Sequence, residues 1–362
     1  MIFSKKLISW YLQNKRAMPW RETKNPYHIW LSEIILQQTR VAQGLPYYLS
    51  FTEAFPTVFD LANAKEEEVL KLWQGLGYYS RARNLHTTAK YVADDLKGVF
   101  PSTYNDLLKL KGVGDYTASA IASICYNEAV PVVDGNVYRV LSRYYGIDTP
   151  INTTKGVKEF KELAITLMDH EQPAEYNQAI MEFGALQCKP QSPYCIVCPI
   201  QDSCDALKEG RVQLLPVKIK KLKIKKRYFN YLVFCTENQK TIVQQRKGKG
   251  IWEGLYEFPL IEGEGVDHAT IDSDDIFKEM VKGKRYEITP FYDKPIVHKL
   301  SHQHLHTQLY IVKVEESPSI IHNQKLIDCT DIHGYPVPIL LGKFIDNFFD
   351  KNSIKKHLKS MS

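Results

Sequence analysis

The chain has 362 residues, of which 44% are hydrophobic and 24% charged, and its formal net charge is +6. This composition is typical of a globular protein of two or three domains and excludes a disordered chain, a collagen-like repeat and a disulfide-dense miniprotein. Because no apolar run approaches the roughly 18 residues of a membrane helix and the N-terminal segment lacks the features of a signal peptide, we expect a cytoplasmic protein.

Residues 1–210 are predicted to be helical, since amphipathic stretches such as EEEVLKLWQGL and TYNDLLKL alternate with short Gly, Pro and Asn segments. In the stretch PYHIWLSEIILQQTR, helical spacing places Glu33 on or beside an apolar stripe that includes Ile29, Trp30 and Leu36. A glutamate on such a face is rarely structural unless it is paired, and burial raises its pKa, as a proton donor requires. Glu33 is therefore a candidate general acid.

The next informative segment is LKGVGDYTASAIAS, residues 110–123, in which two glycines flank one apolar residue before a helix rich in small side chains. Gly112 and Gly114 allow a tight turn and expose backbone N–H groups, and the following helix start favours an anion. This pattern is typical of a helix–hairpin–helix that holds a DNA phosphate without reading a base. An ordinary turn between two helices is the alternative interpretation.

About 20 residues later, Asp134 follows the apolar run VPVV and precedes a helix that begins near Asn136. An aspartate at this position commonly caps a helix. It would also face whatever the hairpin holds, and together with Glu33 it gives one protonated and one ionised carboxyl group. Such a pair can break a glycosidic bond.

Four of the seven cysteines are clustered in the pattern C-x6-C-x2-C-x5-C, formed by Cys188, Cys195, Cys198 and Cys204. Four thiols so close together in a reducing compartment indicate a metal site. Structural zinc usually takes two CxxC pairs, whereas a compact run on one loop is typical of a [4Fe–4S] cluster. The spacing favours the cluster and leaves zinc as the alternative.

The charge is concentrated in residues 217–227, VKIKKLKIKKR, which carry seven positive charges and no negative one. This segment is predicted to be a basic linker between an all-α domain, 1–216, and an α/β domain, 228–362. A strap that lies along the phosphates of a nucleic acid is the alternative interpretation. The second domain is predicted from β-branched and aromatic runs such as YFNYLVFCT, KTIVQQRK, GLYEFPL and HTQLYIVKV, with one closing helix at LLGKFIDNFF.

Taken together, SEIILQQT, GLGYYSRARNLH, LKGVGDYTASAIAS, VDGNVYRVLSR and the four-cysteine loop resemble the helix–hairpin–helix DNA glycosylase superfamily with an iron–sulfur loop, over residues 8–210. LQQTRV and GLGYYSRARN are most similar to the MutY-type adenine glycosylases, which excise adenine mispaired with 8-oxoguanine. GIWEGLYEFPL and HKLSHQHLH resemble the Nudix-like C-terminal domain of that family. The Nudix hydrolase run REUXEEXGU is absent between Gly250 and Lys299, so this domain would recognise a lesion and not hydrolyse a nucleotide.

The resemblance implies catalytic roles for four residues. Glu33 would protonate adenine at N7, Asp134 would stabilise the oxocarbenium sugar electrostatically or through a covalent adduct, and Asn136 would orient water or Asp134. Tyr116 occupies the position at which lyase relatives carry a Schiff-base lysine, in the pattern GVG-x-K. Without that amine, efficient β-elimination is not expected, so the resemblance implies a monofunctional glycosylase.

The resemblance also implies a binding surface for duplex DNA with an 8-oxoG·A or G·A mispair, and a monomeric protein. Trp20 and Arg21, with Tyr116, would line the pocket for the flipped adenine. The residues that would enter the duplex or contact the 8-oxoguanine side are Gln38, Tyr78, Thr39, Leu76 and Ser301. The four cysteines would ligate the [4Fe–4S] cluster.

Two groups of alternatives remain open at this point. The first comprises sibling enzymes, an endonuclease III-like lyase or a G·T mismatch thymine glycosylase. Tyr116 argues against the lyase, and the added α/β domain argues against both. The second is a non-catalytic iron–sulfur DNA-binding protein, which would need neither Glu33 nor Asp134.

Overall fold

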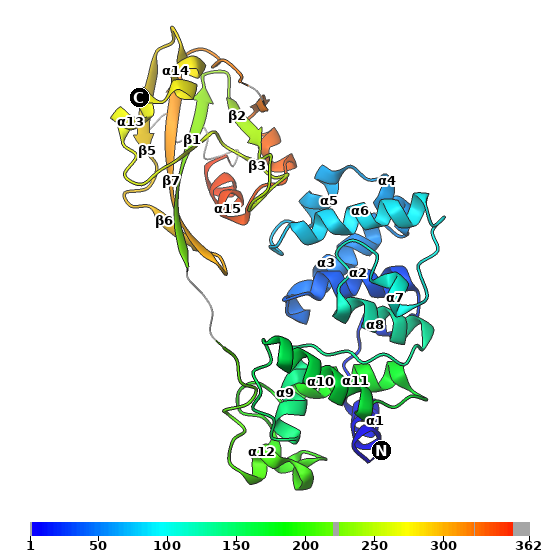
Figure 1. Cartoon of the computed structure of the whole chain (residues 1–362). Coiled ribbons are helices and arrows are strands. Elements are labelled where there is room, and N and C mark those ends of the chain that lie inside the picture. Colours follow the sequence, from blue (N-terminus) through cyan, green and yellow to red (C-terminus); the bar gives the residue numbers. More distant parts are fainter. Residues whose placement is uncertain (1, 220–223, 322, 350–362) are drawn as a thin grey trace. The chain divides into compact units, whose positions relative to one another are not determined.

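The computed structural model describes residues 2–219, 224–321 and 323–349, which form two compact units (Figure 1). The first unit comprises Met1–Asn63 and Asn84–Lys221, and the second comprises Ala64–Arg83 and Leu222–Ser362. Residues 220–223 of the predicted linker, 217–227, lie outside the described ranges. Its last three residues, 225–227, are not linker but begin a strand that pairs with residues 303–305. The grouping of Ala64–Arg83 with the second unit was not predicted from the sequence.

The first unit is helical, as the sequence predicts. Its elements are α1 (Ile2–Asn14), η1 (Pro19–Arg21), α2 (Pro26–Leu36), α3 (Val41–Ala54), α4 (Val58–Asn63), most of α6 (Ser80–Asp94), α7 (Tyr104–Leu107), α8 (Asp115–Tyr126), α9 (Gly135–Tyr144), α10 (Thr154–Leu167), α11 (Pro173–Leu186), η2 (Cys195–Val197), η3 (Gln201–Ser203) and α12 (Asp205–Lys208). None of the helices in the described ranges is long and apolar enough to cross a membrane.

Helix α2 begins where its sequence requires, because the Asn25 side chain accepts the Tyr27 N–H at 3.0 Å and Pro26 occupies the first turn. The sequence predicted a single apolar stripe on this helix. Instead, every residue from Ile29 to Ile35 is buried, because α2 packs against both α3 and α8. Glu33 therefore lies inside the unit.

Helix α11 is central to the first unit and contacts α1, α8 and α9. A core of large side chains joins these elements, including Leu7 on α1, Leu141 on α9 and Tyr176 and Phe183 on α11. Burial of these side chains is worth about 1.5–3 kcal/mol each. It fixes the N-terminus of α9 against the C-terminal half of α11, where the candidate site lies.

The second unit is a mixed α/β fold, also as predicted. Its elements are α5 (Glu66–Leu72), β1 (Lys225–Thr236), β2 (Lys240–Gln245), β3 (Tyr256–Glu257), β4 (Leu260–Glu262), α13 (His268–Ser273), α14 (Asp275–Val281), β5 (Tyr286–Pro290), β6 (Ile296–Lys299), β7 (Gln303–Val314), β8 (Gln324–Asp328), η4 (Asp331–Gly334) and α15 (Ile339–Phe348).

Two sheets form this unit, one in the order β4-β1-β7-β5 with β6 also paired to β7, and the other in the order β3-β2-β8. Strands β1 and β7 are parallel over their full lengths, and the other pairs are antiparallel. Consecutive residues of β1 are buried from Phe229 to Thr236, because both faces of the strand are covered. On one face, Phe277 and Met280 of α14 share a core with Leu232 and Phe234.

The run GLYEFPL does not form the single strand that the sequence predicted. It contributes only β3 and the start of β4, and Pro259 lies between them. Proline has no N–H to donate to a sheet, so it ends the pairing of one strand before the next begins.

The segment Ala64–Arg83, which contains helix α5, contacts the rest of the second unit through its side chains. The Tyr256 hydroxyl donates to Glu67 Oε1 at 2.5 Å, and Lys71 Nζ donates to the Tyr335 carbonyl at 3.2 Å. Arg83 also pairs with Glu253 at 2.9 Å. These contacts explain why a segment so early in the chain belongs to this unit.

Candidate active site

The predicted hairpin is present and leaves the first turn of α8 open. Gly112 has a φ of +80°, and a Cβ atom there would lie 2.8 Å from the Asn84 Cβ, so only glycine fits. Gly114 caps α8 and has no side chain to bond the first N–H groups, while nothing lies within 4 Å of where its Cβ would be. Val113 between them is buried. The turn therefore offers backbone donors and open space for an anion.

An acidic residue at the start of α8 would normally repel a phosphate, but Asp115 is neutralised. It forms an ion pair with Lys161 of α10 and accepts a hydrogen bond from the Tyr104 hydroxyl, and Lys161 also donates to Tyr104 at 3.1 Å. The cluster cancels the charge beside the hairpin. The sequence analysis did not identify it, because its three members come from three different helices.

The predicted general acid, Glu33, is buried with 8% of its surface exposed. Burial raises its pKa from an ordinary 4.5 to about 7. Interaction with the Tyr116 hydroxyl and the Arg21 charge acts in the opposite direction, and repulsion from Asp134 adds to the rise. Near neutral pH, therefore, the Glu33 side chain carries a proton in a large fraction of the protein molecules, and this proton can be donated.

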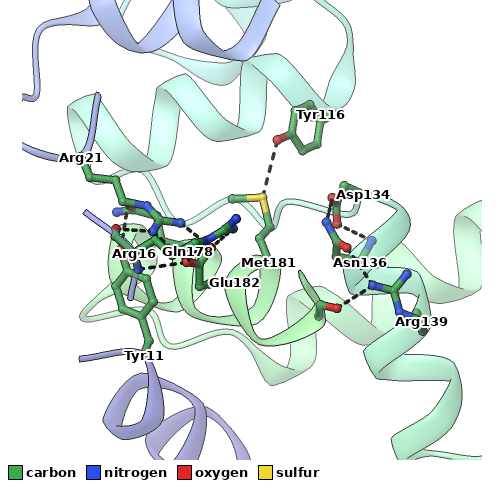
Figure 2. Close-up of polar contacts among 11 residues, drawn as sticks. Tyr11, Arg16, Arg21, Tyr116, Asp134, Asn136, Arg139, Gln178, Met181 and Glu182 are labelled. Atoms are coloured by element: carbon green, nitrogen blue, oxygen red, sulfur yellow. Dashed lines mark hydrogen bonds and ion pairs between the residues drawn. The ribbon is translucent and has the colours of Figure 1, made fainter. Parts of the chain in front are cut away.

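Tyr116, on the first turn of α8, lies beside Glu33 of α2. Burial of the phenol, followed by the charges of Glu33 and Asp134, raises its pKa well above the ordinary range, so it stays a neutral donor. Its hydroxyl also lies 3.6 Å from the Met181 sulfur (Figure 2). The thioether is a weak acceptor, and the carboxyl of Glu33 is the better partner for the hydroxyl proton.

Asp134 is the N-cap of α9, and its charge also acts on Glu33. Its Oδ1 accepts the N–H groups of Asn136 and Val137, both at 2.8 Å, and its Oδ2 accepts Asn136 Nδ2 at 2.7 Å. Burial raises the pKa of Asp134, and the three hydrogen bonds oppose that rise. The Asp134 charge in turn raises the pKa of Glu33. That Glu33 is protonated while Asp134 is ionised stays a prediction.

Asn136 is held in turn by Arg139, which the sequence analysis missed. Arg139 Nη2 donates to Asn136 Oδ1 at 2.8 Å (Figure 2). The same nitrogen donates to the Gly184 carbonyl at 2.6 Å, and Arg139 Nε donates to the Cys188 carbonyl at 2.7 Å. A Cβ atom at Gly184 would lie 2.6 Å from the Asn136 Cβ and 2.9 Å from its carbonyl oxygen. Gly184 therefore allows α11 to approach the segment that carries Asp134.

The other predicted base-pocket and wedge residues of the first unit have distinct environments. Trp20 is buried and makes an edge contact with Tyr48 at 5.0 Å, and Arg21 is engaged by an acid on α11. Gln38 is exposed with a φ of +55°, and Thr39 beside it is half-buried. A left-handed backbone at a non-glycine residue is strained and is common at functional sites.

Three predicted residues lie in the second unit. Leu76 is buried, Tyr78 is 47% exposed and has a φ of +49°, and the Tyr78 hydroxyl is 2.5 Å from Ser301 Oγ. Tyr78 and Ser301 line one open cavity of about 390 Å³ together with Trp252 and Lys299. The structure thus brings together two residues that lie more than 200 positions apart in the sequence.

The four clustered cysteines line one cavity in the first unit, and none forms a disulfide. Buried Arg143 holds the loop, because its Nη1 donates to the Lys189 carbonyl at 2.7 Å and lies 3.4 Å from the Cys188 sulfur. Among the described residues, no three His, Cys, Asp or Glu side chains are placed to bind a metal ion. The four cysteines nevertheless line the same cavity.

Comparison with known proteins agrees with this arrangement. Residues 31–164 match the family of HhH-GPD superfamily base excision DNA repair proteins, and residues 230–347 match the NUDIX domain. Adenine DNA glycosylase of Buchnera aphidicola subsp. Schizaphis graminum is 33% identical over 351 residues, which are 96% of this chain and 99% of that protein. The chain belongs to the adenine DNA glycosylase family.

Two other proteins are similar over a little more than half of the chain. The Homo sapiens protein is 45% identical over 213 residues, which cover 56% of this chain and 39% of that protein. The solved structure of a thermostable thymine-DNA glycosylase is 29% identical, with a TM-score of 0.54, and covers 57% of this chain and 96% of that one. The protein is thus a DNA repair glycosylase with a helix–hairpin–helix domain and a Nudix-like domain.

Proposed function

We propose that this protein is a monofunctional DNA glycosylase that hydrolyses the N-glycosidic bond of adenine opposite 8-oxoguanine, or guanine, in duplex DNA. The observation that carries the proposal is the pair of buried carboxyl groups: Glu33, with a pKa of about 7, and Asp134, which accepts the N–H groups of Asn136 and Val137. The named activity of the relative that matches 99% of its own length supports the choice of adenine.

In the proposed reaction, Glu33 donates its proton to N7 of the extruded adenine, so that the base leaves as a neutral molecule. The charge that develops on the sugar is then stabilised by the carboxylate of Asp134, which Asn136 holds at a fixed orientation. Water adds to the sugar carbon and loses a proton to a carboxylate. Glu33, which has just given up its proton, is the group placed to accept it.

The absence of an amine at position 116 supports a hydrolysis without strand cleavage. A lyase needs a lysine to form a Schiff base with the sugar, and the residue after the hairpin here is a tyrosine whose phenol remains protonated. No step of the proposed reaction leaves a covalent bond between the sugar and a nitrogen of the protein.

For recognition, the hairpin of Gly112 and Gly114 would hold a backbone phosphate through its N–H groups. Gln38 and Tyr78, with their strained backbones, would fill the space that the extruded base leaves. Ser301 would donate a hydrogen bond to 8-oxoguanine and so favour 8-oxoguanine over guanine as the base opposite adenine. The proposed ligand of these residues is therefore a DNA duplex that contains one mispair.

We also propose that Cys188, Cys195, Cys198 and Cys204 hold a [4Fe–4S] cluster, because they face one cavity and are free of disulfides. When bound, the cluster would supply four iron–thiolate bonds that order residues 188–204. The chain's own contribution is made by Arg139 and Arg143, which hold carbonyl groups of this loop.

The experiment that tests the proposal uses duplexes with adenine opposite 8-oxoG, G, C or T, and a G·T duplex in addition, because one structural relative is a thymine-DNA glycosylase. Each reaction is divided and analysed with and without hot alkali. We expect base loss from the 8-oxoG·A and G·A duplexes that becomes strand cleavage only after alkali. Release of thymine without adenine, or cleavage before alkali, would overturn the proposal.

A further inference from the structure

A third buried acid, Glu182 on α11, lies apart from the two carboxyl groups and has no role in the proposed reaction. Only 2% of its side chain is exposed. Its oxygens accept five hydrogen bonds: from Arg16 N–H at 3.1 Å, Nε at 2.8 Å and Nη2 at 2.7 Å, and from Arg21 Nη1 at 3.0 Å and Nη2 at 2.8 Å (Figure 2). Burial acts to raise the pKa of Glu182, but these bonds lower it to about 2.

The charges in this cluster are unequal. One carboxylate faces two guanidinium groups, so the cluster has a net charge of +1. Arg16 by itself would satisfy both oxygens, because its Nε and Nη2 form a bidentate pair with Glu182. A purely structural acid would need no second arginine. The Arg16 side chain is 37% exposed and that of Arg21 only 16%, so water can solvate Arg16, whereas Arg21 is the guanidinium that the cluster encloses. Arg21 therefore needs a separate explanation.

Arg21 is fixed on several sides but retains unused donors. Its Nη1 donates to the Arg16 carbonyl at 2.9 Å and to Glu182, its Nη2 donates to Glu182, and its guanidinium lies over the Tyr11 ring at 5.5 Å. These contacts use three of the five guanidinium protons. In the part of the chain that the structure describes, the Nε–H and the second Nη2–H of Arg21 have no hydrogen-bond acceptor.

The location of Arg21 connects this cluster with the reacting base. The Arg21 side chain is only 16% exposed, and its charge acts on Glu33. Tyr11, whose ring lies against the guanidinium, donates to Gln178 Oε1 at 3.1 Å, so a second polar side chain of α11 lies near Arg21 (Figure 2). A rigid, planar group with two free N–H donors is suited to a ring nitrogen of a purine, which accepts hydrogen bonds in the base plane.

We propose that Glu182 is a positioning residue for base recognition, which holds the Arg21 guanidinium so that its two unused N–H donors meet ring-nitrogen acceptors of the extruded adenine. This inference rests on the proposed function, since it requires adenine in the pocket. Glu182 itself does not touch the base. Its effect passes entirely through Arg21.

The test is a double-mutant cycle with Glu182→Gln, Arg21→Gln and the double variant, measured by single-turnover adenine release from the 8-oxoG·A duplex. We expect each single change to slow release by roughly tenfold or more, and the double variant to match Arg21→Gln within about twofold. The matched control is Arg16→Gln, which breaks the other half of the same cluster and leaves the Arg21 contacts intact. It should slow release less than about threefold.

A second readout separates base recognition from a structural role. A duplex with 2′-fluoro-2′-deoxyadenosine opposite 8-oxoG resists cleavage, because the fluorine disfavours positive charge on the sugar. Wild type should bind it more tightly than the matching abasic duplex. We expect Glu182→Gln to lose most of this preference and Arg16→Gln to retain it. If Glu182→Gln does not fold, Glu182→Asp retains the charge, shortens the reach to Arg21 and is compared in the same way.

Additive effects in the cycle would overturn the inference, because Glu182 would then act independently of Arg21. Equal losses in Arg16→Gln and Glu182→Gln would also overturn it, since the cluster would then be merely structural. If wild type releases no adenine from any duplex, the proposed function fails. If wild type releases adenine and the cycle is additive, only the role of Glu182 fails.

Discussion

Replacement of Glu33 by glutamine should remove activity and, at alkaline pH, increase stability. The folded protein holds the Glu33 proton more tightly than the unfolded chain, since the pKa rises from 4.5 to about 7 on folding. Between these two values the folded state binds more protons, so stability falls as the pH rises, and the loss is complete above about pH 7. At 1.36 kcal/mol per pKa unit, the cost is about 3 kcal/mol.

Glutamine has nearly the same shape and no charge, so Glu33→Gln should recover most of that cost at about pH 8.5 and almost none at about pH 4.5. For a unit of this size the gain corresponds to a rise in Tm of roughly 6–12 °C at the higher pH. The measurement is thermal unfolding at both pH values. Glu53→Gln is the matched control, because Glu53 is an exposed glutamate on α3, and it should change neither Tm.

In the same variant, adenine release from the 8-oxoG·A duplex should fall by roughly 100-fold or more, which is the usual contribution of a general acid. Binding to the duplex should stay within a few fold, because the proton is needed only in the transition state. The reasoning is wrong if Glu33→Gln gains no more stability at alkaline than at acidic pH. It is also wrong if the variant retains more than about a tenth of the wild-type rate.

Tyr116→Lys should produce some strand cleavage together with base release, and borohydride should trap a protein–DNA adduct; base release without any adduct would show that position 116 does not face the sugar. Gly184→Ala should lower stability by about 1–3 kcal/mol and slow adenine release by roughly tenfold, because the added Cβ would displace Asn136; unchanged unfolding and rate would contradict this. Lys161→Met should weaken binding to all duplexes alike, measured at one salt concentration, since it leaves a carboxylate beside the hairpin uncompensated; a loss for one sequence alone would argue otherwise. Ser301→Ala should reduce the preference for 8-oxoG over G opposite adenine, by about 1–3 kcal/mol if the contact is a base-reading hydrogen bond; an unchanged ratio of single-turnover rates would exclude that contact.

Much of the fold and the candidate chemistry could be predicted from the sequence. Local patterns were sufficient for the hairpin of Gly112 and Gly114, for the helix after Asp134 and for the long strands of the second unit. These features depend on turn geometry, capping and alternation of side chains, which a few neighbouring residues determine. The resemblance to a known family added the roles of individual residues, and these roles stay predictions.

Features that depend on distant contacts could not be predicted. Glu33 was predicted on or beside an apolar stripe, with burial raising its pKa, but the burial of every residue from Ile29 to Ile35 depends on the packing of α2 against two other helices. Glu182 has no local signal, because its two arginine partners lie more than 160 positions away. Arg139 contacts Asn136 nearby, but the carbonyl groups of Gly184 and Cys188 that fix its guanidinium lie 45 and 49 positions away. Gly184 offered one clue, a glycine inside the helix sequence EFGAL, which often marks a close approach of two backbones.

The central claim is that adenine is released by a protonated Glu33 acting with an ionised Asp134, and the pH profile of the free protein tests it most directly. The measurement is adenine release from the 8-oxoG·A duplex at a protein concentration below saturation, from about pH 5.5 to about pH 9. A parallel sample is kept free of alkali, so that it shows only strand cleavage made by the protein. The account predicts a rate that declines up to tenfold per pH unit above about pH 7, where Glu33 loses its proton, and no strand cleavage in the parallel sample. A rate that rises with pH through this range, or strand cleavage that accompanies base release, would contradict it.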